Sequence, residues 1–356
     1  MIEMIDSLEI NNFRCFRSLS ISSLGRVNLI AGVNNAGKTA LLEAIYLLAS
    51  PNLPIWPPPL NFLRGLDKLP PNVDLRTRWG WLFRQRDVTQ PISIRWRTND
   101  EITDAQAAAD WRSLDIRWQP IDDAVRFGES PENNQDGLVV LSSKPKGATS
   151  PDIVSVTRAG FTRPEREVAS IPLGVISGAA ERGFEEDARR FSEMYLLPGG
   201  SKPVMEALRV LEPRLVDLRV LNLGGISMLY GEIGIGRPVP LSQMGEGVGR
   251  ILSMVLEITR AAGGIVLIDE VEHGLHHSAM ERIWKVIDHA ARQSNVQVFA
   301  TTHSWECIQA AHMAFEQDPP YDLRLYRLER AGEDVKVISY DRETLGTSVD
   351  MDLEVR

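Results

Sequence analysis

An octapeptide near the start of the chain constrains the fold more than any other feature. Residues Gly32–Thr39 read GVNNAGKT and match the pattern G-x-x-x-x-G-K-[ST]. The apolar run Val27–Ala31 before them is typical of a buried strand, and Ala40–Ala49 after them, rich in alanine and leucine, is typical of a helix. This order predicts a phosphate-binding loop; the alternative is an ordinary glycine turn that leads into a helix.

The residue types in this loop suit phosphate chemistry. Glycines let backbone N–H groups converge on phosphate oxygens, and the start of a helix adds a positive dipole. We expect Lys38 to reach the β- and γ-phosphates as a point charge and the Thr39 hydroxyl to ligate Mg²⁺. The residues expected to contact a nucleotide here are Gly32, Asn34, Asn35, Ala36, Gly37, Lys38, Thr39 and Ala40.

A second chemical signal follows a later strand. The apolar run Ile265–Ile268 is followed by Asp269 and Glu270. Because the carboxyl ends of parallel strands converge at the phosphate loop, Asp269 is expected in the Mg²⁺ shell. Glu270 is expected to orient, or accept a proton from, the water that attacks the γ-phosphate. The alternative is a strand that merely ends in surface acids.

A histidine follows the next predicted strand. Val296–Ala300 runs into Thr301-Thr302-His303-Ser304. His303 at the end of a strand beside such a site can hydrogen-bond the γ-phosphate and report its presence. Taken alone, His303 reads as a surface loop histidine, and the order of the motifs favours the functional interpretation.

The rest of the chain suggests an α/β fold with a β-rich insertion. We expect one domain over residues 1–356, with a lobe carrying the phosphate loop (1–50), an insertion (51–175) and a lobe carrying the later motifs (176–356). Strand–helix alternation in the last third predicts a mostly parallel sheet. The proline-rich run Pro51–Pro59 predicts an irregular surface crossing, and Asp350–Arg356 reads as a loose acidic tail. The strands expected in the insertion are antiparallel and cover Pro91–Thr98, Leu114–Trp118, Gly137–Ser142 and Ile153–Arg158.

Composition bounds the environment and the partners. Lysine and arginine total 39 against 48 acids, a formal net charge of −9, which disfavours coating of nucleic acid by bulk charge. Two cysteines, Cys15 and Cys307, fit a reducing compartment. No apolar run approaches the ~20 residues of a membrane span, and acids at the N-terminus argue against a secretory signal. A cytoplasmic protein without membrane partners is expected.

Four stretches together resemble a known group: Leu8–Phe16, Gly32–Ala44, Leu267–His277 and Val298–Ser304. Their order is similar to that of the ABC-type ATPase heads of the RecF, SMC and OLD families, above all the stand-alone AAA-type ATPases related to OLD proteins.

The resemblance implies a P-loop NTPase with a two-lobed head that dimerises head to tail around two ATP molecules. It also implies that Lys38 and Thr39 hold phosphate and Mg²⁺, Asp269 holds Mg²⁺, Glu270 is the catalytic base and His303 is the switch histidine. The stretch Glu272–His276 would face the dimer partner. Arg14 lies where such heads often reach the nucleotide, and a solvated arginine at a strand end is an equal alternative.

The family's signature segment, which contacts the γ-phosphate of the opposite protomer, is expected at Leu241–Gly247. Gln243 and Met244 replace two glycines of the transporter-type sequence, so either Ser242 or Gly245 could approach phosphate. The Q-loop glutamine has two candidates, Gln85 and Gln90, with nothing to choose between them.

Two weaker features have competing interpretations. Residues 76–97 hold six arginines and three tryptophans, which suits contact with DNA or a partner protein; the alternative is arginine on a solvated face over a tryptophan core. The arginines are Arg76, Arg78, Arg84, Arg86, Arg95 and Arg97, and the tryptophans are Trp79, Trp81 and Trp96. No carboxylate–histidine helix motif frames His273, His276 and His277, and the dimer-facing stretch already accounts for them, so no metal beyond Mg²⁺ is expected.

The motifs predict a Mg²⁺-dependent ATPase. The resemblance implies that it works as an ATP-gated homodimer, acting on DNA or controlling an effector in DNA repair or phage defence. The alternative is a nucleotide-sensing scaffold whose slow hydrolysis times the release of a partner. A transporter subunit is disfavoured by the insertion and the altered signature. About 50 residues follow Ser304, too few for the Toprim nuclease of OLD proteins, so any nuclease is expected to be a separate protein.

Overall fold

The computed structural model describes residues 4–49, 75–98, 111–120, 137–144, 150–157, 160–161, 171–176, 183–196 and 200–355. The proline-rich run 51–59 lies outside these residues. Within the described part of the chain, no helix combines the length and apolar character needed to cross a membrane.

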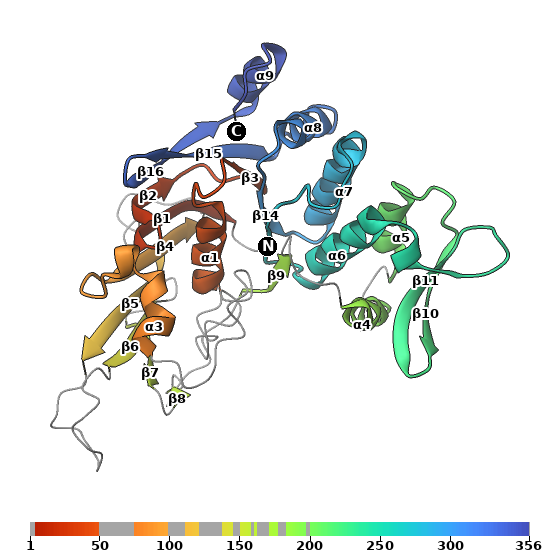
Figure 1. Ribbon diagram of the computed structural model, residues 1–356. Coiled ribbons are helices and arrows are strands. Elements are labelled where there is room, and N and C mark those ends of the chain that lie inside the picture. Colours follow the sequence, from red (N-terminus) through yellow and green to blue (C-terminus); the bar gives the residue numbers. More distant parts are fainter. Residues whose placement is uncertain are drawn as a thin grey trace.

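A six-stranded sheet forms the centre of the molecule (Figure 1). Its strand order is β16-β15-β3-β14-β13-β9; the last five are parallel to one another and β16 is antiparallel. The strands are β3 (Val27–Ala31), β9 (Leu173–Ile176), β13 (Ile265–Ile268), β14 (Gln297–Thr301), β15 (Leu323–Ala331) and β16 (Asp334–Tyr340). The predicted α/β fold with a mostly parallel sheet is confirmed.

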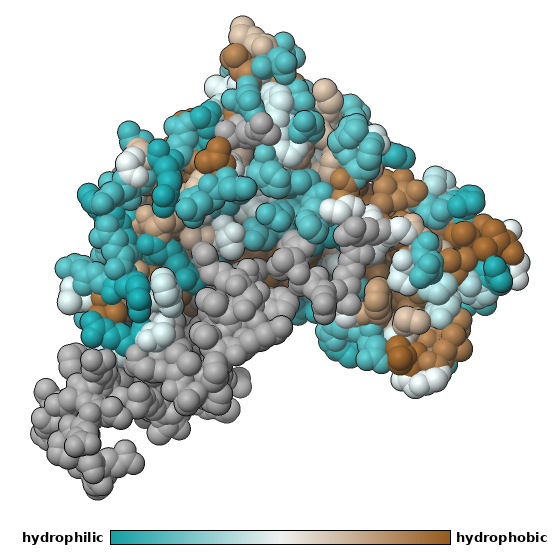
Figure 2. Space-filling view, viewed as in Figure 1, coloured by the Kyte–Doolittle hydropathy of each residue, from teal (hydrophilic) through white to brown (hydrophobic). Residues whose placement is uncertain are grey.

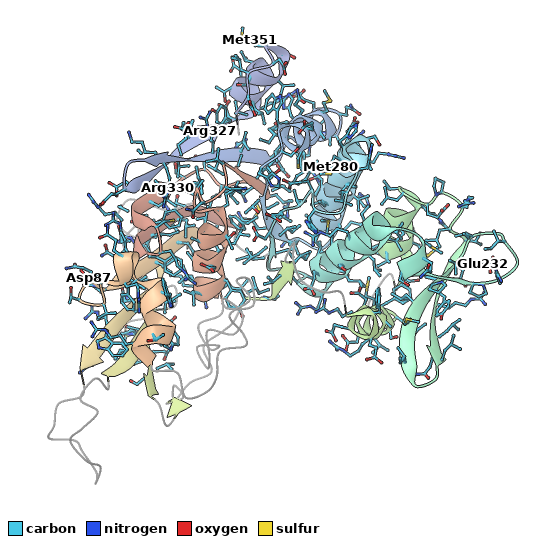
Figure 3. The ribbon with its side chains drawn as sticks, in the orientation of Figure 1. Asp87, Glu232, Met280, Arg327, Arg330 and Met351 are labelled. Atoms are coloured by element: carbon cyan, nitrogen blue, oxygen red, sulfur yellow. The ribbon has the colours of Figure 1, made fainter. Side chains whose placement is uncertain are left out.

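Helices cover both faces of this sheet, which explains why β3, β13 and β14 are buried along their whole length. Val27, Leu29 and Ala31 point into a core shared with three later helices, whereas Ile30 points into a core shared with α1 (Lys38–Ala49). The later helices are α6 (Glu246–Arg260), α7 (Met280–Gln293) and α8 (Trp305–Glu316). Met280, labelled in Figure 3, is buried where α7 begins.

Helix α1 is enclosed between two sheets. Every one of its residues except Thr39 is buried, as expected of a helix that is apolar around its circumference. On its far side lies an antiparallel sheet of order β2-β1-β4-β5-β6-β7-β8. Its strands are β1 (Ile5–Phe13), β2 (Phe16–Ile21), β4 (Ile92–Thr98), β5 (Trp111–Pro120), β6 (Gly137–Lys144), β7 (Asp152–Thr157) and β8 (Gly160–Phe161). The strands of the expected insertion thus extend a sheet that begins with the first two strands of the chain.

Three short helical segments come before β4 of this sheet: α3 (Leu75–Trp79), η1 (Gly80–Leu82) and η2 (Arg84–Arg86). The two large sheets approach each other where β16 lies against β2. There the Arg17 guanidinium pairs with the Asp334 carboxylate, with 3.3 Å between Nε and Oδ1.

A third group of elements projects from the other side of the central sheet (Figure 1). It contains α4 (Phe184–Met194), α5 (Lys202–Arg209), β10 (Asp217–Leu223), β11 (Ile226–Glu232), β12 (Val239–Pro240) and η4 (Leu241–Gln243). The hairpin β10–β11 turns at Gly224 and Gly225, which both have positive φ. That is the requirement of a type I′ turn, and glycine meets it without strain.

Two features differ from the sequence expectation. Strand β9 was not expected; its four residues LGVI give no periodic signal, and pairing with β13 makes it a strand. The prediction of a loose tail over Asp350–Arg356 is wrong at Val355, which is buried. The chain before the tail forms helix α9 (Arg342–Asp350). Asp341 and Thr344 cap that helix reciprocally.

Candidate functional site

The glycine loop leaves β3 and enters α1 in a conformation that depends on its glycines. Gly32 and Gly37 have φ of 148° and 107°. A Cβ at Gly32 would lie 2.7 Å from the Leu328 carbonyl oxygen, and a Cβ at Gly37 would lie 2.8 Å from Cys15 Sγ. The backbone is therefore confined between β15 and the β1–β2 turn, and only glycine fits.

Inside this loop lies the ammonium of Lys38. The side chain is buried, and Nζ donates to the carbonyl oxygens of Gly32 at 2.5 Å and Val33 at 3.1 Å. Burial lowers the pKa of Lys38, while the carboxylates of Asp269, Glu272 and Glu270 act in the opposite direction. An ammonium held inside the loop by these carbonyls can also bind the oxygen of a phosphate that the loop holds.

The other predicted loop residues have distinct environments. Asn34 and Asn35 are exposed on the outside of the turn, whereas Ala36 and Ala40 are buried beneath it. Asn35 has φ of 64°, a left-handed conformation that asparagine tolerates. The assignment of these residues as nucleotide contacts stays a prediction.

The structure brings Thr39 and Asp269 together from distant parts of the sequence. Thr39 Oγ1 lies 3.2 Å from Asp269 Oδ2, and Thr301 Oγ1 donates to Asp269 Oδ1 at 2.6 Å. The described residues contain no cluster of three or more His, Cys, Asp or Glu side chains arranged to hold a metal. A hydroxyl and one carboxylate nevertheless fit Mg²⁺, which is usually bound by few protein oxygens together with phosphate and water.

Glu270 occupies a tight turn directly after β13. Its φ is 50°, and its N–H donates to Thr301 Oγ1 at 2.8 Å. The carboxylate is exposed, with Oε2 3.9 Å from His273 Nδ1. The Thr301 hydroxyl therefore binds both Asp269 and Glu270. No role was predicted for Thr301, although it lies in the stretch Val298–Ser304 that resembles the family. The signal was a hydroxyl residue at the end of the strand neighbouring the acids.

The position of His303 is set by Glu272, a residue expected only as part of the stretch that would face a dimer partner. Glu272 Oε1 lies 3.1 Å from His303 Nδ1, accepts the His303 backbone N–H at 2.9 Å and accepts Thr302 Oγ1 at 2.8 Å. The imidazole itself is half exposed. Glu272 thus joins the segment after β13 to the segment after β14, and its carboxylate binds both the backbone and the imidazole of His303.

Arg14 is not the solvated arginine of the alternative interpretation. Its side chain is 10% exposed and Nε lies 2.9 Å from Oε2 of Glu43, which is fully buried in α1. A second guanidinium nitrogen, Nη1, donates to the Trp81 carbonyl at 3.1 Å. The structure places Arg14 next to the start of the phosphate-loop helix, and its contact with nucleotide stays a prediction.

The expected signature segment lies with α4 and β11 in the third group of elements. Ser242, in η4, lines a small pocket together with Phe184 and Met228. Gly245 precedes α6 with φ of 102°. Both residues are exposed, so the segment is open to a contact from outside the chain.

The arginine–tryptophan segment follows the alternative interpretation for most of its members. Trp79 and Trp96 are buried in the core, and the guanidinium of Arg97 pairs with Asp6. The guanidinium of Arg86 stacks 4.4 Å over the ring of Trp81, which is exposed. Among the remaining arginines, Arg95 pairs with Glu9 and Arg84 with Asp334, while the side chain of Arg78 lies outside the described residues.

The Q-loop candidates gain no support from their surroundings. Gln85 Nε2 donates to Glu333 Oε2 at 3.3 Å, and Gln90 is exposed before β4. The surroundings therefore do not select a Q-loop residue, and both glutamines stay candidates.

Comparison with known proteins gives a consistent picture. The family described as "AAA domain, putative AbiEii toxin, Type IV TA system" matches residues 27–306. An "ATP/GTP phosphatase" of Helicobacter pylori is 24% identical over 96% of this chain and 97% of that protein. An "OLD nuclease" of Thermus scotoductus is 23% identical over 98% of this chain, which spans 66% of that protein. A solved Smc head bound to the C-terminal winged-helix domain of ScpA superimposes with a TM-score of 0.56 at 12% identity, covering 96% of this chain and 99% of that chain.

Proposed function

Since this chain belongs to the AAA_21 family of AAA domains, we propose that it hydrolyses ATP with Mg²⁺ as a homodimer that closes when ATP is bound. The family match, the relatives and the Smc head together confirm the resemblance described above: the chain is an ATPase with the head fold of OLD, RecF and SMC proteins. The finer proposal rests mainly on one observation: Thr39, Asp269 and Thr301, which follow or end three neighbouring strands, are joined by hydrogen bonds beside Lys38.

We infer a separate task for each group. The loop N–H groups and Lys38 bind the phosphates, and Thr39 and Asp269 would hold Mg²⁺. Bound Mg²⁺ neutralises charge that develops on the phosphate oxygens. The exposed Glu270 carboxylate orients the attacking water and accepts its proton, while His303, held by Glu272, donates to the γ-phosphate.

Dimerisation supplies what a single chain leaves open. The exposed segment with Ser242 and Gly245 precedes the N-terminus of α6, whose partial positive charge favours an anion. A helix end contributes about 0.3–1 kcal/mol when exposed and up to ~2 kcal/mol when partly buried. Two such ends, engaged only when γ-phosphate is present, would shift a dimer equilibrium by roughly 10²-fold.

The output of this cycle is proposed to be control of a separate effector, or action on DNA, in DNA repair or phage defence. An OLD nuclease is among the relatives, and this chain spans 66% of it. A head that opens and closes with ATP would gate such an effector without performing the cleavage itself. A cytoplasmic location fits this role.

The substitution Glu270→Gln tests the proposal. It keeps the size and the polar contacts of the side chain but removes its basicity, so ATP binding should persist while turnover falls by at least about 10²-fold. ATP should then trap a dimer, measured by light scattering after size exclusion with ATP and Mg²⁺. Glu281→Gln, in a half-buried pair with Lys285 on α7 away from the site, is the matched control. Hydrolysis at the wild-type rate in Glu270→Gln would show that another group is the base.

A further inference from the structure

Helix α6 carries a buried arginine one turn after it begins. Arg250 is 5% exposed, and its Nη2 donates to the carbonyl oxygens of Asp269 at 3.0 Å and Glu270 at 3.1 Å. Burial of a guanidinium is costly unless its hydrogen bonds are made. The two acids of the candidate site are thus bonded through their backbone to the helix that follows the signature segment.

The turn that Arg250 contacts is conformationally demanding. Glu270 is a non-glycine residue with positive φ, which persists only where the surroundings enforce it. From the sheet side, Ile176 O accepts the Asp269 N–H at 2.8 Å, and Thr301 accepts the N–H groups of Glu270 and Val271. The sheet therefore holds the three N–H groups of this turn, and Arg250 holds two of its carbonyl oxygens.

These contacts divide the turn between a fixed and an adjustable support. Strands β9 and β14 flank β13 in the buried parallel sheet and hold its end in register. Helix α6 begins at the exposed Gly245, where a second molecule's nucleotide is expected to bind. A shift of the first turn of α6 would pass to the Glu270 backbone through the Arg250 guanidinium.

We propose that Arg250 is a positioning residue for Glu270. Arg250 fixes the direction of the Glu270 carboxylate and couples that carboxylate to the signature end of α6. This inference rests on the proposed function, because it takes Glu270 as the base. Arg250 touches backbone carbonyls in the structure and is not assigned to the reacting atoms. Its effect should therefore appear in the rate of the chemical step and not in the affinity for ATP.

The conservative variant Arg250→Lys tests the proposal and keeps a donor and a charge at the position. Both bonds come from Nη2, and the Nζ of a lysine ends one bond short of that position, so the two carbonyl contacts cannot both be kept and the turn should loosen. We expect kcat for ATP hydrolysis to fall by roughly 10- to 100-fold, as misplacement of a catalytic group does, with KM within about twofold of wild type. Equal kcat in the variant and the wild type overturns the proposal.

Arg260→Lys is the matched control on the same helix. Arg260 Nη2 also donates to a strand carbonyl, that of Leu173 at 2.8 Å, but its side chain is 46% exposed and bonds Glu257 rather than the acid turn. This variant should keep the wild-type kcat. A fall in kcat in both variants that follows a loss of thermal stability in both would mean a structural role for α6 and would overturn the proposal.

Hydrogen exchange provides a readout that does not need turnover. Peptides covering 269–272 should exchange faster in Arg250→Lys than in wild type, and Arg260→Lys should match wild type there. If wild type hydrolyses no ATP, the proposed function fails, and equal exchange in all three proteins would overturn the role of Arg250 separately. A double variant, Arg250→Lys with Glu270→Gln, should lose no more activity than Glu270→Gln alone, since both changes act on one group.

Discussion

The two ends of the predicted nucleotide site differ in how complete they are. At the phosphate-loop end, Lys38, Thr39 and Asp269 already hydrogen-bond to protein groups and are packed against the central sheet. At the signature end, Ser242 and Gly245 are exposed on a segment that packs with α4 and β11. One half of the predicted site is held by hydrogen bonds within the chain, and the other half consists of exposed residues, which the proposed dimer would cover.

The surfaces of the two ends differ in the same direction. Figure 2 shows hydrophilic side chains over much of the part that contains the large antiparallel sheet and apolar ones gathered over the β10–β11 hairpin. Exposed apolar residues there include Leu223, Ile226 and Ile235. Asp87 and Glu232, labelled in Figure 3, lie at opposite sides of the molecule and mark the two regions.

The largest effect is expected at the complete end, from Asp269→Asn. The change removes the carboxylate charge expected to bind Mg²⁺, and it weakens the contact with Thr301 Oγ1. We expect kcat for ATP to fall by about 10³-fold or more, measured by phosphate release. Asp318→Asn, at an exposed position after α8, should leave the rate unchanged. A modest loss in Asp269→Asn would mean that the metal is held elsewhere.

A loss of about 10²-fold is expected at the open end, from Gly245→Val. The φ of 102° excludes a β-branched residue without rearrangement, so the start of α6 should no longer fit a phosphate. ATP binding by the monomer should persist. Mixing this variant with Asp269→Asn should restore activity, because one of the two composite sites in a mixed dimer has neither defect. Absence of rescue would place the signature residue in the same chain as the phosphate loop it serves.

A smaller effect, of the order of 10-fold, is expected from Thr301→Val. The hydroxyl that serves both Asp269 and Glu270 is lost within a buried site. An unsatisfied N–H there should also cost about 1–3 kcal/mol of unfolding free energy, measured by urea denaturation. Thr301→Ser keeps the hydroxyl and should retain most activity. If Thr301→Val is as active as Thr301→Ser, the hydroxyl does not contribute to the rate.

The smallest effect is expected at the apolar hairpin, from Leu223→Ser. The side chain is exposed at the turn, so the free energy of unfolding should change by no more than about 0.5 kcal/mol and ATP hydrolysis should remain within about twofold. Leu229→Ser, buried on β11, should destabilise the protein by several times more. A large loss of turnover in Leu223→Ser would indicate that the hairpin belongs to the catalytic dimer.

The sequence predicted those parts of the site whose chemistry is local. The strand β3, the loop and α1 follow from eight consecutive residues and their flanks, and the acids after β13 follow from an apolar run that stops abruptly. The pairing of Thr301 with Asp269, and of Arg250 with the carbonyls after β13, joins residues through tertiary structure. An arginine within an amphipathic helix reads as a solvated residue until its neighbours are known.

The same distinction explains the errors in the fold. Strand β9 exists because β13 offers a partner edge, not because LGVI prefers an extended backbone. β1 joins β4 in one sheet through backbone pairs such as Glu9 with Arg95, which lie far apart in the chain. Helix α9 did have a local signal, the reciprocal cap of Asp341 and Thr344, which the sequence analysis did not use.

The central position of β3 has a consequence for biosynthesis. Its two neighbours are β14 and β15, so Val27 pairs with Val298 on one side and with Leu323 on the other. At about 5–20 residues per second, the ribosome needs roughly 15–60 s after β3 emerges to make both partners. During that interval the glycine loop lacks the central sheet, and nascent chains should acquire nucleotide affinity only when their last third has been translated.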